Sequence, residues 1–185
     1  TLKASGAHAY TSAPMALSVM GCEAEFRSCR FEVVPLAGQE ERCRATLMSI
    51  SSGARVEAHD CSWASTDEIC LLVHSASSAV LHNCALDIHV SCAQVEGLAA
   101  WLVVEESLVA AQSSRITLDL APGARGAHYA LDARSHAHVQ LHDCHLASSP
   151  AAGATAHVVE GAQLQCTRTV IEGGPSRVVV QEGAH

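Results

Sequence analysis

One pattern of apolar and polar positions recurs along the chain. Over eight residues it reads apolar, any, apolar, any, any, small, any, large apolar. It occupies residues 24–31, 56–63, 79–86, 109–116, 139–146 and 164–171. Apolar residues two positions apart are typical of a strand that buries one face. Each window therefore predicts two short strands that meet at a turn beside the small residue.

A second apolar stretch separates successive windows. It lies at residues 16–19, 46–50, 71–73, 101–104, 129–131, 157–159 and 178–180. Each repeat thus predicts three short strands and a variable loop. One such repeat cannot bury its own apolar face, but stacked repeats bury it between them. The pattern therefore predicts an all-β solenoid whose equivalent strands pair in parallel, about 4.8 Å apart.

The small residues of the windows predict a ladder at one corner of the solenoid. They are Cys29, Cys61, Cys84, Ser114, Cys144 and Thr169. Stacked coils place equivalent side chains in one inward column, and small side chains avoid collision there. Asp60, Asn83 and Asp143 directly precede three of them, and Asp and Asn tolerate left-handed turns better than most residues. We expect this column to be structural.

Two other interpretations compete with the solenoid. Residues 97–112 are rich in Ala, Leu and Glu and would suit a helix on their own, but 109–116 keep the repeat pattern. A β-sandwich is the main alternative for the whole chain. We favour one solenoid domain over residues 16–185, preceded by a cap or tail at residues 1–15.

The corners at Cys61, Cys84 and Cys144 share a His, then Asp or Asn, then the cysteine. In this they resemble right-handed parallel β-helix repeat proteins of the pectate-lyase-like superfamily, over Ala16 to about Val180. The resemblance implies a right-handed parallel β-helix of about six coils. The Cys-rich corners look most like those of intracellular, non-enzymatic members, such as β-helix regions of certain F-box proteins and of a spindle-associated Shc-binding protein. These motifs are specific for the fold and not for a function.

Composition narrows the function classes. The net charge of −8 argues against nucleic-acid binding, which needs clustered Lys and Arg. The longest apolar run, residues 97–104, is too short to cross a membrane. The nine cysteines are odd in number and lie mostly in apolar contexts, with no Cys-x-x-Cys pair. We interpret them as reduced, buried residues, which favours an intracellular, cytoplasmic location.

Candidate chemistry is sparse, and we expect no enzyme activity, no cofactor and no catalytic or metal-binding residue. Asp60 and Asp143 lie too many coils apart to act as paired carboxylates. The twelve histidines include His136 and His138, which would face the same way on a strand as a zinc pair. No spacing fixes a third or fourth ligand, so we interpret the histidines as outer-face residues. His59 and His82 occupy equivalent positions on successive coils, and their rings could stack.

The function expected from these features is a non-catalytic scaffold for protein–protein interaction within a larger protein. The acidic balance suggests a partner with a basic surface. The unpaired backbone of the terminal coils suggests homo-oligomers as a further possibility. The alternative function is a carbohydrate-binding or polysaccharide-cleaving module. An open groove with three or more acids, or two exposed aromatic rings, would favour that alternative.

Overall fold

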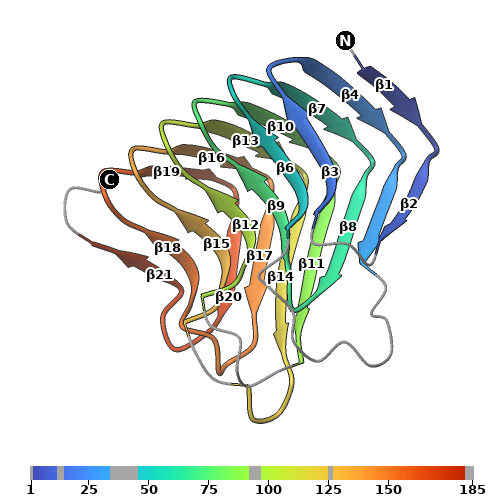
Figure 1. The fold of residues 1–185 in the computed structure, drawn as a ribbon. Coiled ribbons are helices and arrows are strands. Elements are labelled where there is room, and N and C mark those ends of the chain that lie inside the picture. Colours follow the sequence, from blue (N-terminus) through green and yellow to red (C-terminus); the bar gives the residue numbers. More distant parts are fainter. Residues whose placement is uncertain (1, 12–14, 34–45, 92–96, 125–126, 182–185) are drawn as a thin grey trace.

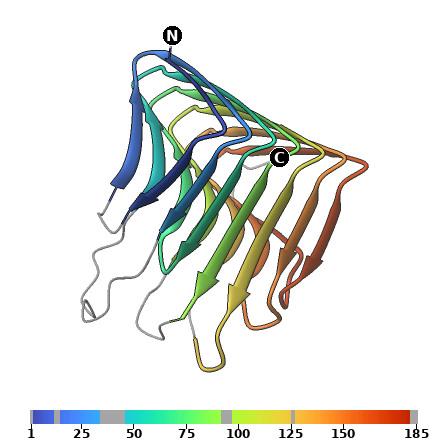
Figure 2. The ribbon, with the colours of Figure 1, turned by 90° about the vertical axis from the view of Figure 1, so that its right-hand side faces the viewer.

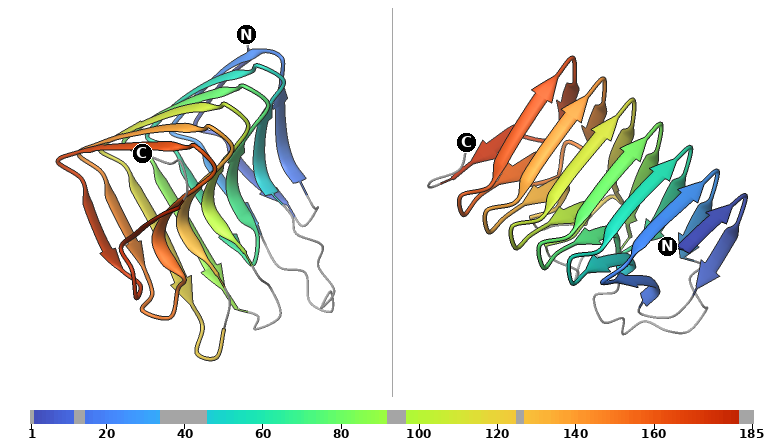
Figure 3. Two further views of the ribbon diagram at one scale, coloured as in Figure 1. Left: turned by 90° about the vertical axis from the view of Figure 1, so that its left-hand side faces the viewer. Right: turned by 90° about the horizontal axis from the view of Figure 1, so that it is seen from above.

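Three sheets of parallel strands wind around a single core (Figure 1). This computed structural model describes residues 2–11, 15–33, 46–91, 97–124 and 127–181, which contain strands and turns but no helix. Equivalent strands follow one another in sequence order along the stack (Figure 3). The predicted all-β parallel solenoid of about six coils is therefore confirmed.

The three sheets are named A, B and C in the order in which the chain visits them. Sheet A contains β1 (Leu2–Ser5), β4 (Glu23–Arg27), β7 (Arg55–His59), β10 (Ser78–His82), β13 (Leu108–Gln112), β16 (His138–His142) and β19 (Gln163–Thr167). Sheet B contains β2 (His8–Thr11), β5 (Arg30–Val33), β8 (Ser62–Thr66), β11 (Ala85–Val90), β14 (Arg115–Leu120), β17 (His145–Ser148) and β20 (Val170–Gly173). Sheet C contains β3 (Met15–Met20), β6 (Thr46–Ser51), β9 (Ile69–Val73), β12 (Ala99–Val103), β15 (Tyr129–Ala133), β18 (Ala154–Val158) and β21 (Val178–Val180).

The pairing register reproduces the eight-residue windows. Their first apolar residues form one row across sheet A: Ala24, Val56, Ala79, Val109, Val139 and Leu164. The segment 97–112 forms β12 and β13 instead of a helix. Tertiary pairing on both sides of each strand therefore overrides the local helix preference.

The segment expected to be a cap or tail contains the first two strands. β1 pairs with β4, and β2 pairs with β5, in the same register as the later coils. The pattern continues into this segment: Ala7 takes the place of the small corner residue, and Ala9 takes the place of the large apolar one, opposite Phe31. The small side chain of Ala9 is the reason why the sequence pattern was not recognised there.

The corner between sheets A and B has the same backbone in every coil. The residue before the corner residue is left-handed each time, with φ between 50° and 64°: Gly6, Ser28, Asp60, Asn83, Ser113, Asp143 and Arg168. In the six of these residues that come before Arg168, the N–H donates to a carbonyl of the next coil, as from Asp60 to His82 at 2.9 Å. The corner therefore continues the hydrogen-bond ladder instead of interrupting it, and the left-handed preference expected of Asp60, Asn83 and Asp143 is confirmed.

The corner between sheets C and A is a tight turn. Glu105 and Glu106 lie in it with φ of 57° and 58°. His136 also lies in this turn, with φ of 62°, and only His138 belongs to β16. The expected placement of His136 and His138 together on one strand is therefore wrong. His136 instead packs over Gly161 of the next coil, where an added Cβ would collide with its imidazole ring.

Large apolar side chains fill the centre of the solenoid. Trp63 and Trp101 are fully buried. The Phe31 ring stacks on Trp63 with centroids 5.4 Å apart, and Phe26 meets Phe31 edge-on at 5.6 Å. The described turn from β17 to β18, residues 149–153, lies at the lower end of the strands (Figure 2). The outward residues of β7, β11 and β14 are exposed or half-buried.

Candidate functional site

The outer face of sheet A carries three straight rows of outward side chains. Because the strands pair in register, every second residue of one strand lies beside its equivalent in the next. The middle row is Lys3, Glu25, Glu57, Val80, Ala110, Gln140 and Gln165. The row nearest sheet B is Ser5, Arg27, His59, His82, Gln112, His142 and Thr167. We call this second row the histidine row.

The first part of this face is charged. Glu25 lies between Lys3 and Arg27, at 2.8 and 2.6 Å. The Lys3 ammonium, followed by the Arg27 guanidinium, holds the pKa of the Glu25 carboxyl below its usual range. An open depression of about 540 Å³ lies here, and its lining includes Glu23, Glu25 and Glu57 beside Lys3 and Arg55. Three acids therefore gather in a groove, next to two cations.

The second part of the face, on β10, β13, β16 and β19, is uncharged apart from its histidines. The outward residues of these strands include no Asp, Glu, Lys or Arg. Leu108 and Val80 are exposed, at 50% and 37% of their surface. An open depression of about 400 Å³ runs beside Ala110, Gln112 and Gln140. We call this region, the outward side of β10, β13, β16 and β19, the neutral face.

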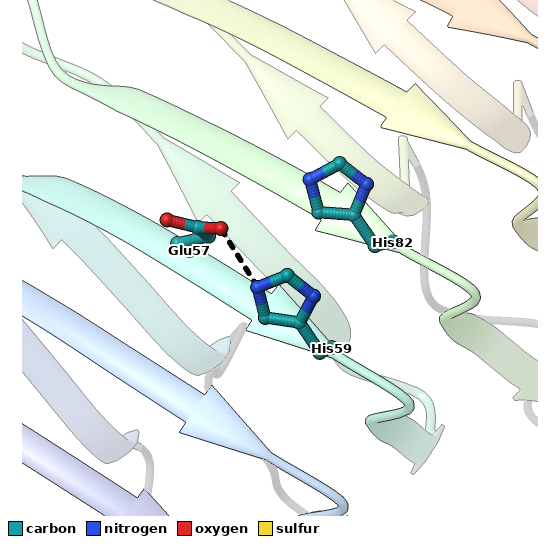
Figure 4. Close-up of side chains that lie close together, drawn as sticks. All are labelled: Glu57, His59 and His82. Atoms are coloured by element: carbon teal, nitrogen blue, oxygen red, sulfur yellow. Dashed lines mark hydrogen bonds and ion pairs between the residues drawn. The ribbon is translucent and has the colours of Figure 1, made fainter.

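Glu57, His59 and His82 meet where the charged part and the neutral face join (Figure 4). The His59 and His82 rings stack with centroids 4.8 Å apart and an angle of 13° between their planes, which confirms the expected stacking. Glu57 Oε1 lies 2.7 Å from His59 Nε2. One ligand atom from each residue lies within 4.8 Å of the others. In the part of the chain that the structure describes, this is the one such group of three His, Cys, Asp or Glu residues.

His142, farther along the histidine row, has different neighbours. The Arg168 guanidinium contacts His142 Nε2 and binds both carboxylate oxygens of Asp143 at 2.7 Å. This guanidinium lowers the pKa of the Asp143 carboxyl and the ion pair raises the pKa of Arg168. The positively charged Arg168 side chain therefore already contacts both the ring nitrogen of His142 and the carboxylate of Asp143 in this second cluster.

A third histidine cluster lies on the outer side of sheet C and was missed from the sequence. Asp132 is buried, and its carboxylate accepts hydrogen bonds from Arg134 Nε at 2.9 and 3.0 Å. His157 Nδ1 lies 2.9 Å from the same carboxylate. The His157 ring stacks on Tyr129 with centroids 4.4 Å apart. The sequence signal for this cluster is Asp132, an acidic residue within the apolar segment 129–133 and two residues before Arg134.

The six expected ladder residues lie at the corner between sheets A and B, as one continuous column. Backbone N–H groups contact the side chain of the next coil: Cys29 to Cys61 at 3.4 Å, Cys84 to Ser114 at 3.0 Å and Cys144 to Thr169 at 3.4 Å. All are buried except Thr169, in the last full coil, which is half-buried.

The thiols of this column are shielded from reagents. Seven cysteines in the described chain are free: Cys22 and Cys166 are exposed, and the other five are buried. The Cys84 thiol lowers the pKa of its neighbour Cys61 to about 6, and the same contact raises the pKa of Cys84. Burial raises the pKa of Cys70 to about 12. Since Cys61 is only 2% exposed, its lower pKa does not make it an accessible nucleophile.

Comparisons with known protein families, with curated proteins and with solved structures found no match to this chain. The described residues also include no helix long and apolar enough to cross a membrane.

Proposed function

We propose that this protein is a non-catalytic scaffold that binds another protein through the neutral face of sheet A. The observation that carries this proposal is a large uncharged area on a chain with a net charge of −8. The central part of a protein–protein interface is depleted of charged residues, because burying an unpaired charge is costly. Leu108 and Val80 provide exposed apolar contacts on this face.

The surroundings of the neutral face indicate the chemistry of the partner. Glu106 borders the depression beside Leu108 and Ala110, and Glu57 lies next to Val80 in the middle row. A partner with an apolar and amide-rich centre and basic residues at its rim fits this arrangement. Rim charges of opposite sign accelerate association and suppress wrong partners.

A pair of matched substitutions tests this face. Ala110→Glu places a charge at the centre of the neutral face, and Ala85→Glu places one on the outer face of sheet B, beside Arg115. Both alanines are half-buried outward residues. We expect the parent and the Ala85→Glu variant to capture and cross-link the same protein. The Ala110→Glu variant should not capture it. Equal capture by both variants would contradict binding at this face.

A carbohydrate-binding function is the second candidate, supported by the groove that holds Glu23, Glu25 and Glu57. Lys3 and Arg27 lower the pKa of Glu25, so this residue does not suit the role of the protonated acid that glycosidic cleavage needs. Binding of a polysaccharide that is lost in Glu23→Ala and kept in Ala110→Glu would favour this candidate over the scaffold.

We also propose a superfamily and a cellular compartment for this protein. The six Cys, Ser or Thr corner residues support a right-handed parallel β-helix of the pectate-lyase-like superfamily, closest to its intracellular non-enzymatic members. The seven free cysteines support a reducing, cytoplasmic compartment.

Self-association through the terminal coil is a further contact that we propose. In the described chain, β21 pairs only with β18, and Val178 and Val180 are 41% and 55% exposed. Such an edge can pair with another strand. Light scattering over a dilution series should show a dimer for the parent and a monomer for Val178→Lys. A parent that is monomeric throughout would contradict the contact.

A further inference from the structure

We propose that Glu57, His59 and His82 are the ligands of one zinc-type divalent metal ion on the outer face of sheet A. Two imidazoles and one carboxylate form a common ligand set for a zinc ion that keeps a fourth position for water. Strands β7 and β10 supply the three residues, so the ion would join two successive coils.

The distances between the three side chains suit a single ion. Zinc lies about 2.0–2.2 Å from imidazole nitrogens and carboxylate oxygens, so two ligand atoms of a tetrahedral site are roughly 3.4 Å apart. Here one ligand atom from each residue lies within 4.8 Å of the others, and Glu57 and His59 are 2.7 Å apart. The two rings must also turn out of their stack, because the nitrogen lone pairs of parallel rings lie in planes that do not meet at one ion. Glu57 is exposed and both histidines are only half-buried, so these side chains have room to rotate.

The charge of the cluster also suits a cation. With neutral imidazoles, Glu57 leaves the group with one negative charge. Within the described residues, His59 is the only side chain that pairs with the Glu57 carboxylate. Arg27, the neighbour of His59 in the histidine row, already binds Glu25 at 2.6 Å. Arg55 lines the adjacent groove together with Glu57, but among the described residues it forms no ion pair with the Glu57 carboxylate, which pairs with His59. The three ligand groups are therefore not paired with a Lys or Arg of the described chain.

The ligand types select the kind of metal. Imidazole nitrogen suits zinc and its neighbours among the divalent transition metals, whereas calcium and magnesium prefer sites made of oxygen. The two histidines of this site therefore favour zinc over calcium or magnesium. His142 cannot form an equivalent site, because the Arg168 guanidinium contacts its Nε2.

The test is metal titration of the purified chain, after treatment with a chelator, followed by competition with a chromophoric zinc indicator. One zinc ion per chain is expected for the parent. His59→Ala, His82→Ala and Glu57→Gln should each weaken binding at least roughly 100-fold, since even loss of an outer-shell partner costs about 10- to 100-fold. Cobalt should give the visible absorption of a four-coordinate ion in the parent and not in these three variants.

His142→Ala is the matched control, because it removes a histidine of the same row that already has a cationic partner. Its zinc affinity should equal that of the parent. Zinc should also raise the melting temperature of the parent and of His142→Ala, but not that of His82→Ala. Absence of stoichiometric binding, or binding that is unchanged in all three ligand variants, would overturn the proposal.

Discussion

Two clusters on this solenoid combine histidine with a carboxylate. In one the carboxylate is buried, and in the other it is exposed to solvent. Asp132, with a side chain only 1% exposed, is held by Arg134 and His157 on sheet C. Glu57, with a side chain 55% exposed, pairs within the described chain only with His59, which stacks on His82 on sheet A. The buried cluster includes its own cation, and the exposed one does not.

The difference follows from the cost of burying charge. A carboxylate removed from water must be paired and hydrogen-bonded, so Asp132 requires Arg134 and His157 as partners. Glu57 keeps its water and requires no cation for folding. The buried cluster therefore stabilises the coil in which it lies, whereas the exposed cluster remains available to bind something from solution.

The largest effect should come from Asp132→Ala. It removes the one acceptor shared by Arg134 and His157. Removing one partner of a buried pair costs about 3–5 kcal/mol. Arg134 is 38% exposed and keeps part of its hydration, so we expect a loss of about 3 kcal/mol, at the lower end of that range. Urea unfolding of the parent and the variant measures it.

Glu57→Ala is the counterpart in the exposed cluster. We expect it to change the free energy of unfolding by less than about 0.5 kcal/mol in the presence of a chelator, as is usual for surface positions. If the two variants lost equal stability, the distinction between a structural and an available cluster would be wrong.

A smaller effect is expected for His157→Ala. The Asp132 carboxylate then loses one hydrogen bond but keeps those from Arg134. Stacking on Tyr129 is lost as well. Because a hydrogen bond to a charged group contributes about 1.5–3 kcal/mol, we expect a loss of about 2 kcal/mol in urea unfolding. His59→Ala, on the exposed face, should lose no more than about 0.5 kcal/mol, and a larger loss there would show that the stacked rings are structural.

The repeating parts of the fold could be predicted from the sequence. A window that recurs six times fixes the strands, the corner residues and the register at once, since one register shift would expose every buried side chain. Even the stacking of His59 on His82 follows from this register. The first coil could not be recognised, because Ala9 stands where the later coils have a large apolar residue.

The candidate sites were less predictable, because they depend on side-chain burial and on contacts between side chains, which the apolar repeat pattern does not report. Glu57 lies two residues before His59 on one strand, and its rotamer brings it to the ring. Asp132 and His157 meet because β15 and β18 are adjacent, but only the structure shows that the carboxylate is buried. His136 was misplaced because a two-residue turn ends just before β16, and apolar periodicity does not report such turns.

The smallest effect concerns the His142–Asp143–Arg168 cluster, in which a guanidinium lies beside a histidine of the same row. Arg168 keeps the pKa of Asp143 below the ordinary value of 3.8. A lowered carboxyl pKa means that the ion pair is fully formed above the unfolded-state pKa and is lost as the pH falls through the lower folded-state value. In Arg168→Ala, the Asp143 pKa should therefore rise toward 3.8. Carboxyl NMR titration in acid measures this shift.

Asp119 is the internal control for that titration, because its pKa is lowered by Ser149 and His89 and not by Arg168. Its titration should be the same in the parent and in Arg168→Ala. The substitution also frees His142 Nε2, but His142 and Asp143 alone supply two ligands, so zinc stoichiometry should stay at one ion per chain. A second zinc ion in Arg168→Ala would show that two ligands are enough to bind zinc on this face. The three ligands Glu57, His59 and His82 would then not set their cluster apart from that of His142 and Asp143.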